Sequence, residues 1–164
     1  MTPESTSPVP ATTPQTPSVS PAKPVQNALT WIMTIKSPED YQKLQGLVQQ
    51  LSSAPAGQNP IAAAADTLGI IHFLRFVFLE NNTKLGVMTI YDGDFDTYVN
   101  EFVNQVGPIF DAVLAHMADA PPLPTQTYRA QFNAYVRAND VPVVMFYSAY
   151  PTSTVLDIWA ATGK

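Results

Sequence analysis

One nine-residue stretch, IHFLRFVFL from Ile71 to Leu79, constrains the fold of this 164-residue chain more than any other. It is rich in aromatic and β-branched residues, which favour a β-strand. The turn residues Glu80-Asn81-Asn82 follow it, and residues 84–91 then form a second strand-like run. The sequence therefore predicts a β-hairpin over residues 70–91.

Both faces of the first hairpin strand are apolar. Successive side chains of a strand point to opposite faces. One face is therefore expected to carry Ile71, Phe73, Val77 and Leu79, and the other Leu74, Phe76 and Phe78. A single layer of helices covers one face only, and leaving several such side chains in water costs a few kcal/mol at roughly 25 cal/mol per Å². We therefore expect a second copy of the chain to cover the other face. Two alternatives are coverage by an inserted or C-terminal helix, and a single unit with a modest core.

The remaining elements are predicted from periodicity and capping residues. Residues 29–35 alternate as a strand, and residues 141–150, VPVVMFYSAY, are nearly all apolar, as in a strand covered on both faces. Four segments have helical features: 38 to about 52 after the N-cap Ser37, 60 to between 65 and 68 after Asn59, 95–117 after Asp94 with a break or kink at Gly107-Pro108, and 125–138. A short C-terminal helix is expected after Thr152-Ser153-Thr154.

The order strand, helix, strand, strand, helix, strand is the ferredoxin-like βαββαβ pattern with inserted helices. It predicts an α+β fold with a four-stranded antiparallel sheet in the order 4-1-3-2 and helices on one face. With the second face covered by another copy, two sheets would pack face to face as a dimeric α+β barrel.

The N-terminal segment has a different composition. Seven of residues 2–24 are Pro and nine are Ser or Thr, which leaves too little apolar surface to offset the entropy lost on ordering. We expect residues 1–26 to be a disordered tail and residues 27–164 to be the folded domain. A passive tail is the favoured interpretation. The alternative is a tether or docking site for a partner, with Pro14–Pro17 as a minimal PxxP match.

Charge and composition exclude several classes of function. Eight basic and thirteen acidic residues give a net charge of −5, which argues against nucleic acid as a partner. The absence of cysteine excludes disulfides and thiolate metal sites. No apolar run reaches the roughly 18 residues of a membrane span, and the first residues lack the features of a signal peptide. We therefore expect a cytoplasmic protein that does not enter membranes.

Five segments resemble an uncharacterised bacterial family of dimeric α+β barrel type: NALTWIMTIKSPED, IHFLRFVFLE, TIYDGDFDTYVNEFV, AYVRANDVPVVMFYSAYP and TVLDI. The resemblance spans about residues 27–158 and implies a ferredoxin-like barrel and a homodimer. Such proteins are grouped loosely with dye-decolourising peroxidases, for which haem would be the cofactor. Here Thr89 stands where the first glycine of the peroxidase motif belongs, and we do not expect 164 residues to include the second domain that carries the haem-ligating histidine. The resemblance thus implies the fold and leaves the chemistry open.

Four polar side chains could belong to a ligand-binding site, but each also has a structural explanation. His72 and Arg75 are three apart on a strand, so they face opposite sides unless a bulge intervenes. A hydrogen bond to a loop carbonyl at the strand start is the favoured role for His72. For Arg75 we favour an ion pair, with Asp92 or an acid of a second subunit as its partner. Tyr91 and Tyr147 could orient a ligand through their hydroxyls, although packing is the simpler explanation.

Metal sites receive little support from the sequence. His116 follows a helix, whose C-terminal end favours a cation. Asp92, Asp94 and Asp96 resemble the start of a calcium loop only superficially, because Val103 occupies the position of its glutamate. We therefore predict no metal site.

Two functional hypotheses follow. In the first, a dimeric barrel binds an apolar or aromatic small molecule, with a tetrapyrrole as one candidate and oxidoreductase-type chemistry as the analogy drawn from fold alone. Its expected ligand-binding residues are His72, Arg75, Tyr91, Asp92 and Tyr147. In the second, the domain is a non-catalytic assembly module that dimerises through the barrel and reaches a partner through its tail. The sequence contains no nucleophile elbow, phosphate loop or dinucleotide motif.

Overall fold

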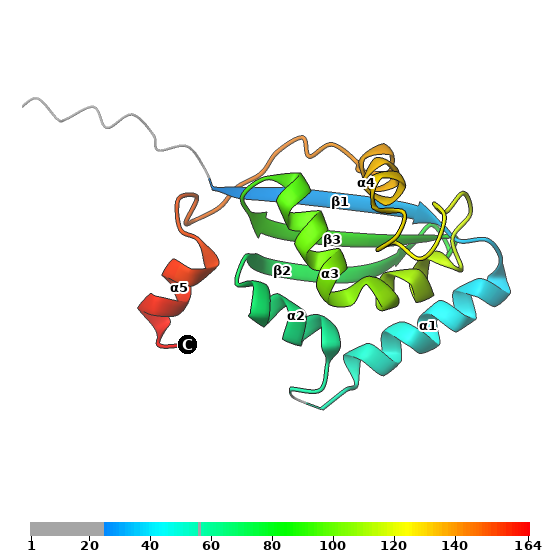
Figure 1. Ribbon diagram of the computed structural model, residues 1–164, viewed down its shortest axis with the longest axis horizontal. Coiled ribbons are helices and arrows are strands. Elements are labelled where there is room, and N and C mark those ends of the chain that lie inside the picture. The colour runs from blue at the N-terminus through cyan, green and yellow to red at the C-terminus, as the bar shows by residue number, and fades with distance from the viewer. Residues whose placement is uncertain (1–24, 56) are drawn as a thin grey trace, which may run out of the picture.

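The computed structural model describes residues 25–55 and 57–164, so the predicted tail lies, except for its last two residues, outside the described part. Within that part, five helices accompany a three-stranded antiparallel sheet, which makes the fold α+β (Figure 1). The elements run in the order β1 (Gln26–Thr34), α1 (Pro38–Ser52), α2 (Pro60–Leu68), β2 (Ile71–Leu79), β3 (Lys84–Asp92), α3 (Phe95–Leu114), α4 (Arg129–Ala138) and α5 (Val155–Thr162).

The hairpin predicted over residues 70–91 is present as β2 and β3. Its turn places Glu80, Asn81 and Asn82 at positive φ angles of 49°, 53° and 65°, a conformation that asparagine tolerates better than most residues. β3 is the central strand, and the sheet order is β1-β3-β2. The pairing Trp31–Val87–Phe76 across the three strands fixes which side chains share a face.

Local capping determines where the helices begin. Ser37 caps α1 by accepting a hydrogen bond from the Asp40 amide, and Asn59 caps α2 by accepting from Ile61 and Ala62. Asp94 caps α3, which contains a non-helical residue at Val106, immediately before the Gly107-Pro108 pair. The predicted caps and the predicted kink are therefore present in the structure.

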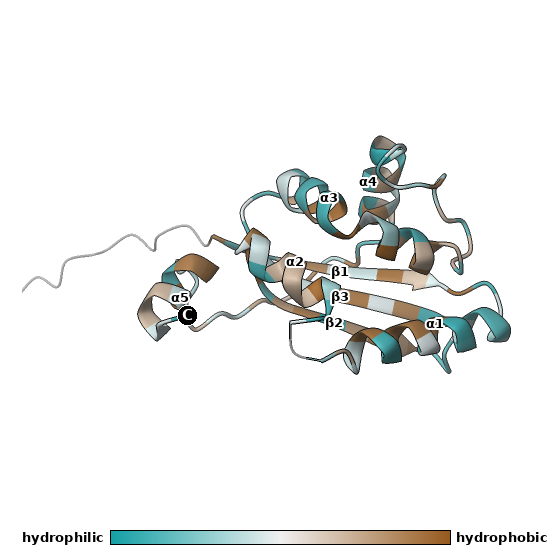
Figure 2. Cartoon of the chain, turned by 60° about the horizontal axis from the view of Figure 1, so that its bottom comes forward, coloured by the Kyte–Doolittle hydropathy of each residue, from teal (hydrophilic) through white to brown (hydrophobic). Residues whose placement is uncertain are grey.

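The core lies between the sheet and the helices. Trp31 is 2% exposed and makes edge-to-face contacts with Phe110, Phe132 and Tyr135 of α3 and α4. α1 reaches the same layer through Leu44, which is fully buried, and through Tyr41 against Phe78 of β2. Figure 2 shows α3 and α4 on one side of a sheet whose strands are coloured largely as hydrophobic.

The opposite side, here called the open face, carries Ala28, Thr30 and Ile32 of β1, Phe73, Arg75, Val77 and Leu79 of β2, and Gly86, Met88 and Ile90 of β3. Phe73 is 73% exposed in the single chain. The expectation that one helical layer covers only one face of this sheet is thus met. α5 packs at one end of the sheet, where Leu156 and Trp159 lie against Gly69.

The structure does not show a fourth strand at residues 141–150. The segment runs beside β1 and is hydrogen-bonded to it near both ends, from the Val141 amide to the Thr30 carbonyl and from the Val25 amide to the Pro151 carbonyl. Ten residues lie between Asp140 and Pro151, while five lie between their partners Trp31 and Val25. The segment therefore carries five residues more than a continuous ladder needs. It therefore bows away from the edge of β1 and leaves Met145 84% exposed.

Candidate functional site

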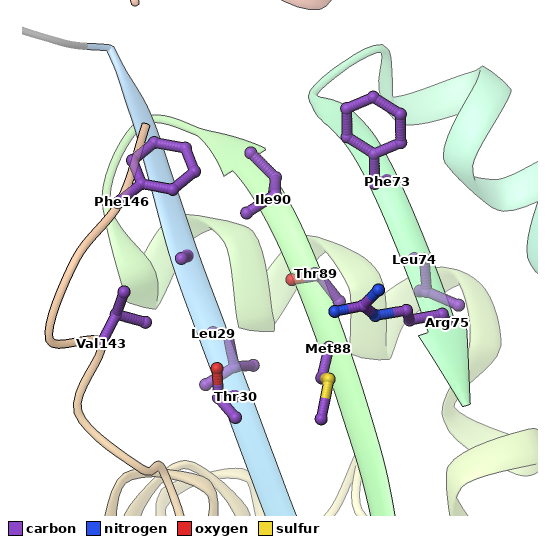
Figure 3. Close-up of a pocket in the computed structure, with 11 residues that line it drawn as sticks. Leu29, Thr30, Phe73, Leu74, Arg75, Met88, Thr89, Ile90, Val143 and Phe146 are labelled. Carbon is purple, nitrogen blue, oxygen red and sulfur yellow. The ribbon is translucent and has the colours of Figure 1, made fainter. Parts of the chain in front are cut away.

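A groove of about 450 Å³ lies on the open face, which is within the usual size range of small-molecule sites. Its base is formed by the small side chains Ala28 and Thr30 of β1 and by Met88 and Ile90 of β3. Phe73 borders it on β2, and Val143 and Phe146 border it on the segment beyond β1 (Figure 3). The groove is therefore mainly apolar and is shared between the sheet and residues 141–150.

Cross-strand pairing explains this composition. The rows Ala28–Ile90–Phe73 and Thr30–Met88–Arg75 cross the three strands on the open face. Next to them, Gly86 leaves space that the ends of Ile32, Leu79 and Met88 occupy, since a Cβ there would lie 3.1 to 3.4 Å from their terminal carbons. One end of the face is thus filled by its own side chains, and the small residues of β1 leave the other end hollow.

Arg75 is the single charged residue among those lining the groove. Its guanidinium extends from β2 over β3 (Figure 3), and the side chain is exposed in the single chain. None of the ion pairs formed by the described residues includes Arg75. The expected pairing of Arg75 with Asp92 is therefore wrong, because Asp92 contacts other groups.

Asp92 binds His72 and the start of α5. Its Oδ1 lies 2.8 Å from Nε2 of His72, and its Oδ2 accepts a hydrogen bond of 2.7 Å from the Val155 amide. The two side chains are only 6% and 9% exposed. The pairing register shifts between Ile71 and Phe73, so His72 occupies a bulge that directs its ring toward the end of β3. The His72–Asp92 pair thus anchors α5 to the hairpin. His72 has a structural contact at the strand start, but its partner is the Asp92 carboxylate and not the expected loop carbonyl.

The two candidate tyrosines lie in different places. Tyr91 is on the core side of β3, 4% exposed and stacked on Tyr98 with ring centroids 4.0 Å apart. Burial raises the pKa of Tyr91, and the negative charge of Asp140 adds to the effect. Tyr147 is exposed on the bowed segment and does not line the groove. Of the five predicted site residues, the structure therefore brings His72 and Asp92 together and leaves Arg75, Tyr91 and Tyr147 apart.

The apolar lining of the groove was not among the predicted site residues. Met88 and Ile90 alternate with Val87 and Thr89, and this period of two marks them as members of the second face. The contribution of Phe146 could not be inferred, because it depends on how the segment after Asp140 departs from β1.

The second histidine also has a structural contact. Nδ1 of His116, two residues beyond α3, lies 2.7 Å from Oδ1 of Asp40 in the first turn of α1. This hydrogen bond from His116, together with one from Ser37, lowers the pKa of Asp40. The end of α3 is thereby joined to the beginning of α1.

The residues present do not fit a histidine-ligated haem in the groove. Both histidines of the chain are bonded to carboxylates, and neither lines the groove. Within residues 25–55 and 57–164, no group of three or more His, Cys, Asp or Glu side chains is arranged to hold a metal ion.

Comparisons with protein-family models, curated proteins and solved structures found no match. Among the helices of the described residues, none combines the length and the apolar character needed to cross a membrane.

Proposed function

We propose that this domain is a homodimeric ferredoxin-like barrel whose interior binds an apolar small molecule. The observation that carries the proposal is the open face, where a mainly apolar groove of about 450 Å³ is bordered by a phenylalanine that is 73% exposed. An exposed apolar surface of this kind is typical of an interaction site. Packing two open faces together would bury Phe73, Met88 and Ile90 of both copies.

The ferredoxin-like topology is part of the same proposal. Residues 141–150 take the position of the fourth strand, which gives the order 4-1-3-2. This assignment is supported by the hydrogen bonds that tie both ends of the segment to β1 and by the antiparallel bridge between Trp31 and Asp140. The resemblance to the bacterial dimeric α+β barrel family supports the same arrangement.

The dimer is tested by light scattering at micromolar concentration. The wild-type chain of 17.8 kDa should scatter as a particle of twice that mass. Phe73→Glu places a charge within the proposed interface and should yield a monomer. Tyr128→Glu is the matched control, because Tyr128 is another exposed aromatic residue, located just before α4 on the helical side. A wild-type monomer, or equal effects of the two substitutions, would refute the dimer.

Ligand binding is tested on protein purified from its own cells under mild conditions. A native mass spectrum should reveal a small adduct on the dimer, and Ile90→Trp, which fills the groove, should remove it. Lys43→Gln on the outer side of α1 should retain the adduct. A dimer free of any adduct, which also fails to bind a neutral apolar dye, would contradict the small-molecule function.

A non-catalytic assembly module is the second candidate, and one observation favours it. The polar groups best suited to chemistry, His72 and Asp92, are occupied in holding α5. In this case the open face serves dimerisation alone, and the N-terminal tail engages the partner. The dye measurement separates the two candidates: a dimer without dye binding supports the assembly module.

A further inference from the structure

Arg75 differs from the other two arginines of the chain. Arg129 donates hydrogen bonds to the Asn100 carbonyl and to Asn104, and Arg137 pairs with Asp96 at 2.7 Å. Arg75 forms no ion pair within the described residues, and no carboxylate is among the residues that line its groove. An acidic chain with net charge −5 thus presents, in its groove, one positive charge and an apolar surface.

The proposed dimer makes this charge consequential, and the inference rests on that proposed function. In a two-fold interface, the same surface patch of each copy meets the other. The partner's open face therefore contributes a second Arg75 and no acid. Two guanidinium groups would enter an interior without a counter-charge, and a buried charge without a partner is strongly unfavourable.

We propose that the groove binds an organic monocarboxylate with an apolar body, whose carboxylate pairs with Arg75. The planar guanidinium donates two parallel hydrogen bonds to a carboxylate, a geometry that a hydroxyl or an ether cannot match. The alkyl or aromatic body of the ligand lies along Phe73, Met88 and Ile90. One cation per chain compensates one negative charge, so the groove favours a monoanion over a polyanion such as a nucleotide.

The test is a competition experiment on the full-length chain. N-phenyl-1-naphthylamine, a neutral dye that fluoresces in apolar sites, reports occupancy of the groove. Decanoate and decan-1-ol then compete with it, because they share an alkyl chain and differ in the charged group. The ratio of their two inhibition constants is measured in each protein, and this ratio cancels any change in the affinity for the dye.

In the wild-type protein, decanoate should compete at a concentration about tenfold lower than decan-1-ol, which is the size of effect expected of a charge-assisted hydrogen bond. Arg75→Gln should bring the ratio close to one. Arg75→Lys, which keeps the charge and loses the planar fork, should give an intermediate ratio. Lys43→Gln removes one positive charge from the exposed surface of α1 and should leave the wild-type ratio unchanged.

Each of the other outcomes overturns a different statement. If the dye binds and the two competitors are equivalent in the wild-type protein, the groove is an apolar site without preference for an anion, and this inference fails while the proposed function stands. If Lys43→Gln lowers the ratio as much as Arg75→Gln, the preference arises from overall charge and the role of Arg75 is refuted. If protein that carries no adduct also fails to bind the dye, the small-molecule function itself fails.

Discussion

Replacing Asp92 by alanine should release the C-terminal helix and lower the stability of the whole domain. The carboxylate of Asp92 accepts from Nε2 of His72 and from the amide of Val155, and both side chains of the pair are at least nine-tenths buried. Hydrogen bonds to a charged group contribute about 1.5–3 kcal/mol each. Because α5 can undock and expose the freed groups to water, we expect a total loss of about 3 kcal/mol in the free energy of unfolding.

The substitution Asp92→Asn separates charge from hydrogen bonding. Its amide oxygen can still accept from Val155, and its NH2 group can donate to Nε2 once the imidazole adopts its other tautomer. Both contacts are then neutral, so we expect a loss of about 1 kcal/mol. Asp66→Ala is the matched control, because Asp66 also pairs with the C-terminal region, through Lys164, but both side chains of that pair are more than half exposed. Such surface pairs contribute about 0–1 kcal/mol.

The measurement is urea unfolding at pH 7, followed by circular dichroism and by tryptophan fluorescence. Trp159 is in α5 and packs near Gly69, whereas Trp31 is in the core, so Trp31→Phe isolates the signal of the C-terminal helix. The expected order of stability is wild type, Asp66→Ala, Asp92→Asn and Asp92→Ala. If Asp92→Ala were as stable as Asp66→Ala, the anchoring role of Asp92 would be refuted, and the interpretation of His72 and Asp92 as ligand-binding residues would regain support.

Three further outcomes are expected from local features. Thr154→Ala removes the capping box of α5 and should cost about 1 kcal/mol, with lower amide-exchange protection confined to that helix. Leu44→Ala leaves a cavity beneath α1 and should cost about 2–5 kcal/mol in urea unfolding, since Leu44 is fully buried. Acid should lower the stability of the domain by protonating carboxyls at the starts of its helices. The carboxyls of Asp40, Asp94 and Asp157 have folded-state pKa values below the ordinary 3.8. The stability that they contribute is therefore complete above pH 3.8 and is lost as the pH falls through the folded pKa. When these residues are changed to Asn, a titration of the unfolding midpoint from pH 6 to pH 2 should show a smaller loss of stability in acid.

The elements that could be predicted from the sequence are those specified by short-range signals. Ser37, Asn59 and Asp94 each stand immediately before a helical periodicity, and the structure uses all three as caps. The α4 helix begins at Arg129, four residues later than expected, because residues from Thr125 to Tyr128 form turns after the proline-rich loop. Helix starts are thus predictable where a capping side chain is present, and Tyr128 provides none.

Long-range pairing was harder to predict. The composition of residues 141–150 is that of a buried strand, but whether they form one depends on the five surplus residues between Asp140 and Pro151, which only the positions of the tethers reveal. Likewise, Asp92 is one of two partners that the sequence suggests for Arg75, but the bulge at His72 turns the His72 ring toward Asp92. The apolar second face was predictable, because it follows from the period of two along β2.

The bowed segment also affects the energetics of any encounter at this edge. Its two ends are fixed by hydrogen bonds to β1, while the residues between them have length to spare and expose apolar side chains. A partner that holds these residues in one extended conformation must overcome roughly 1–2 kcal/mol of backbone entropy for each residue it orders. Complexes formed here will therefore be weaker than their contact area alone suggests, and shortening the segment would strengthen them without adding a single contact.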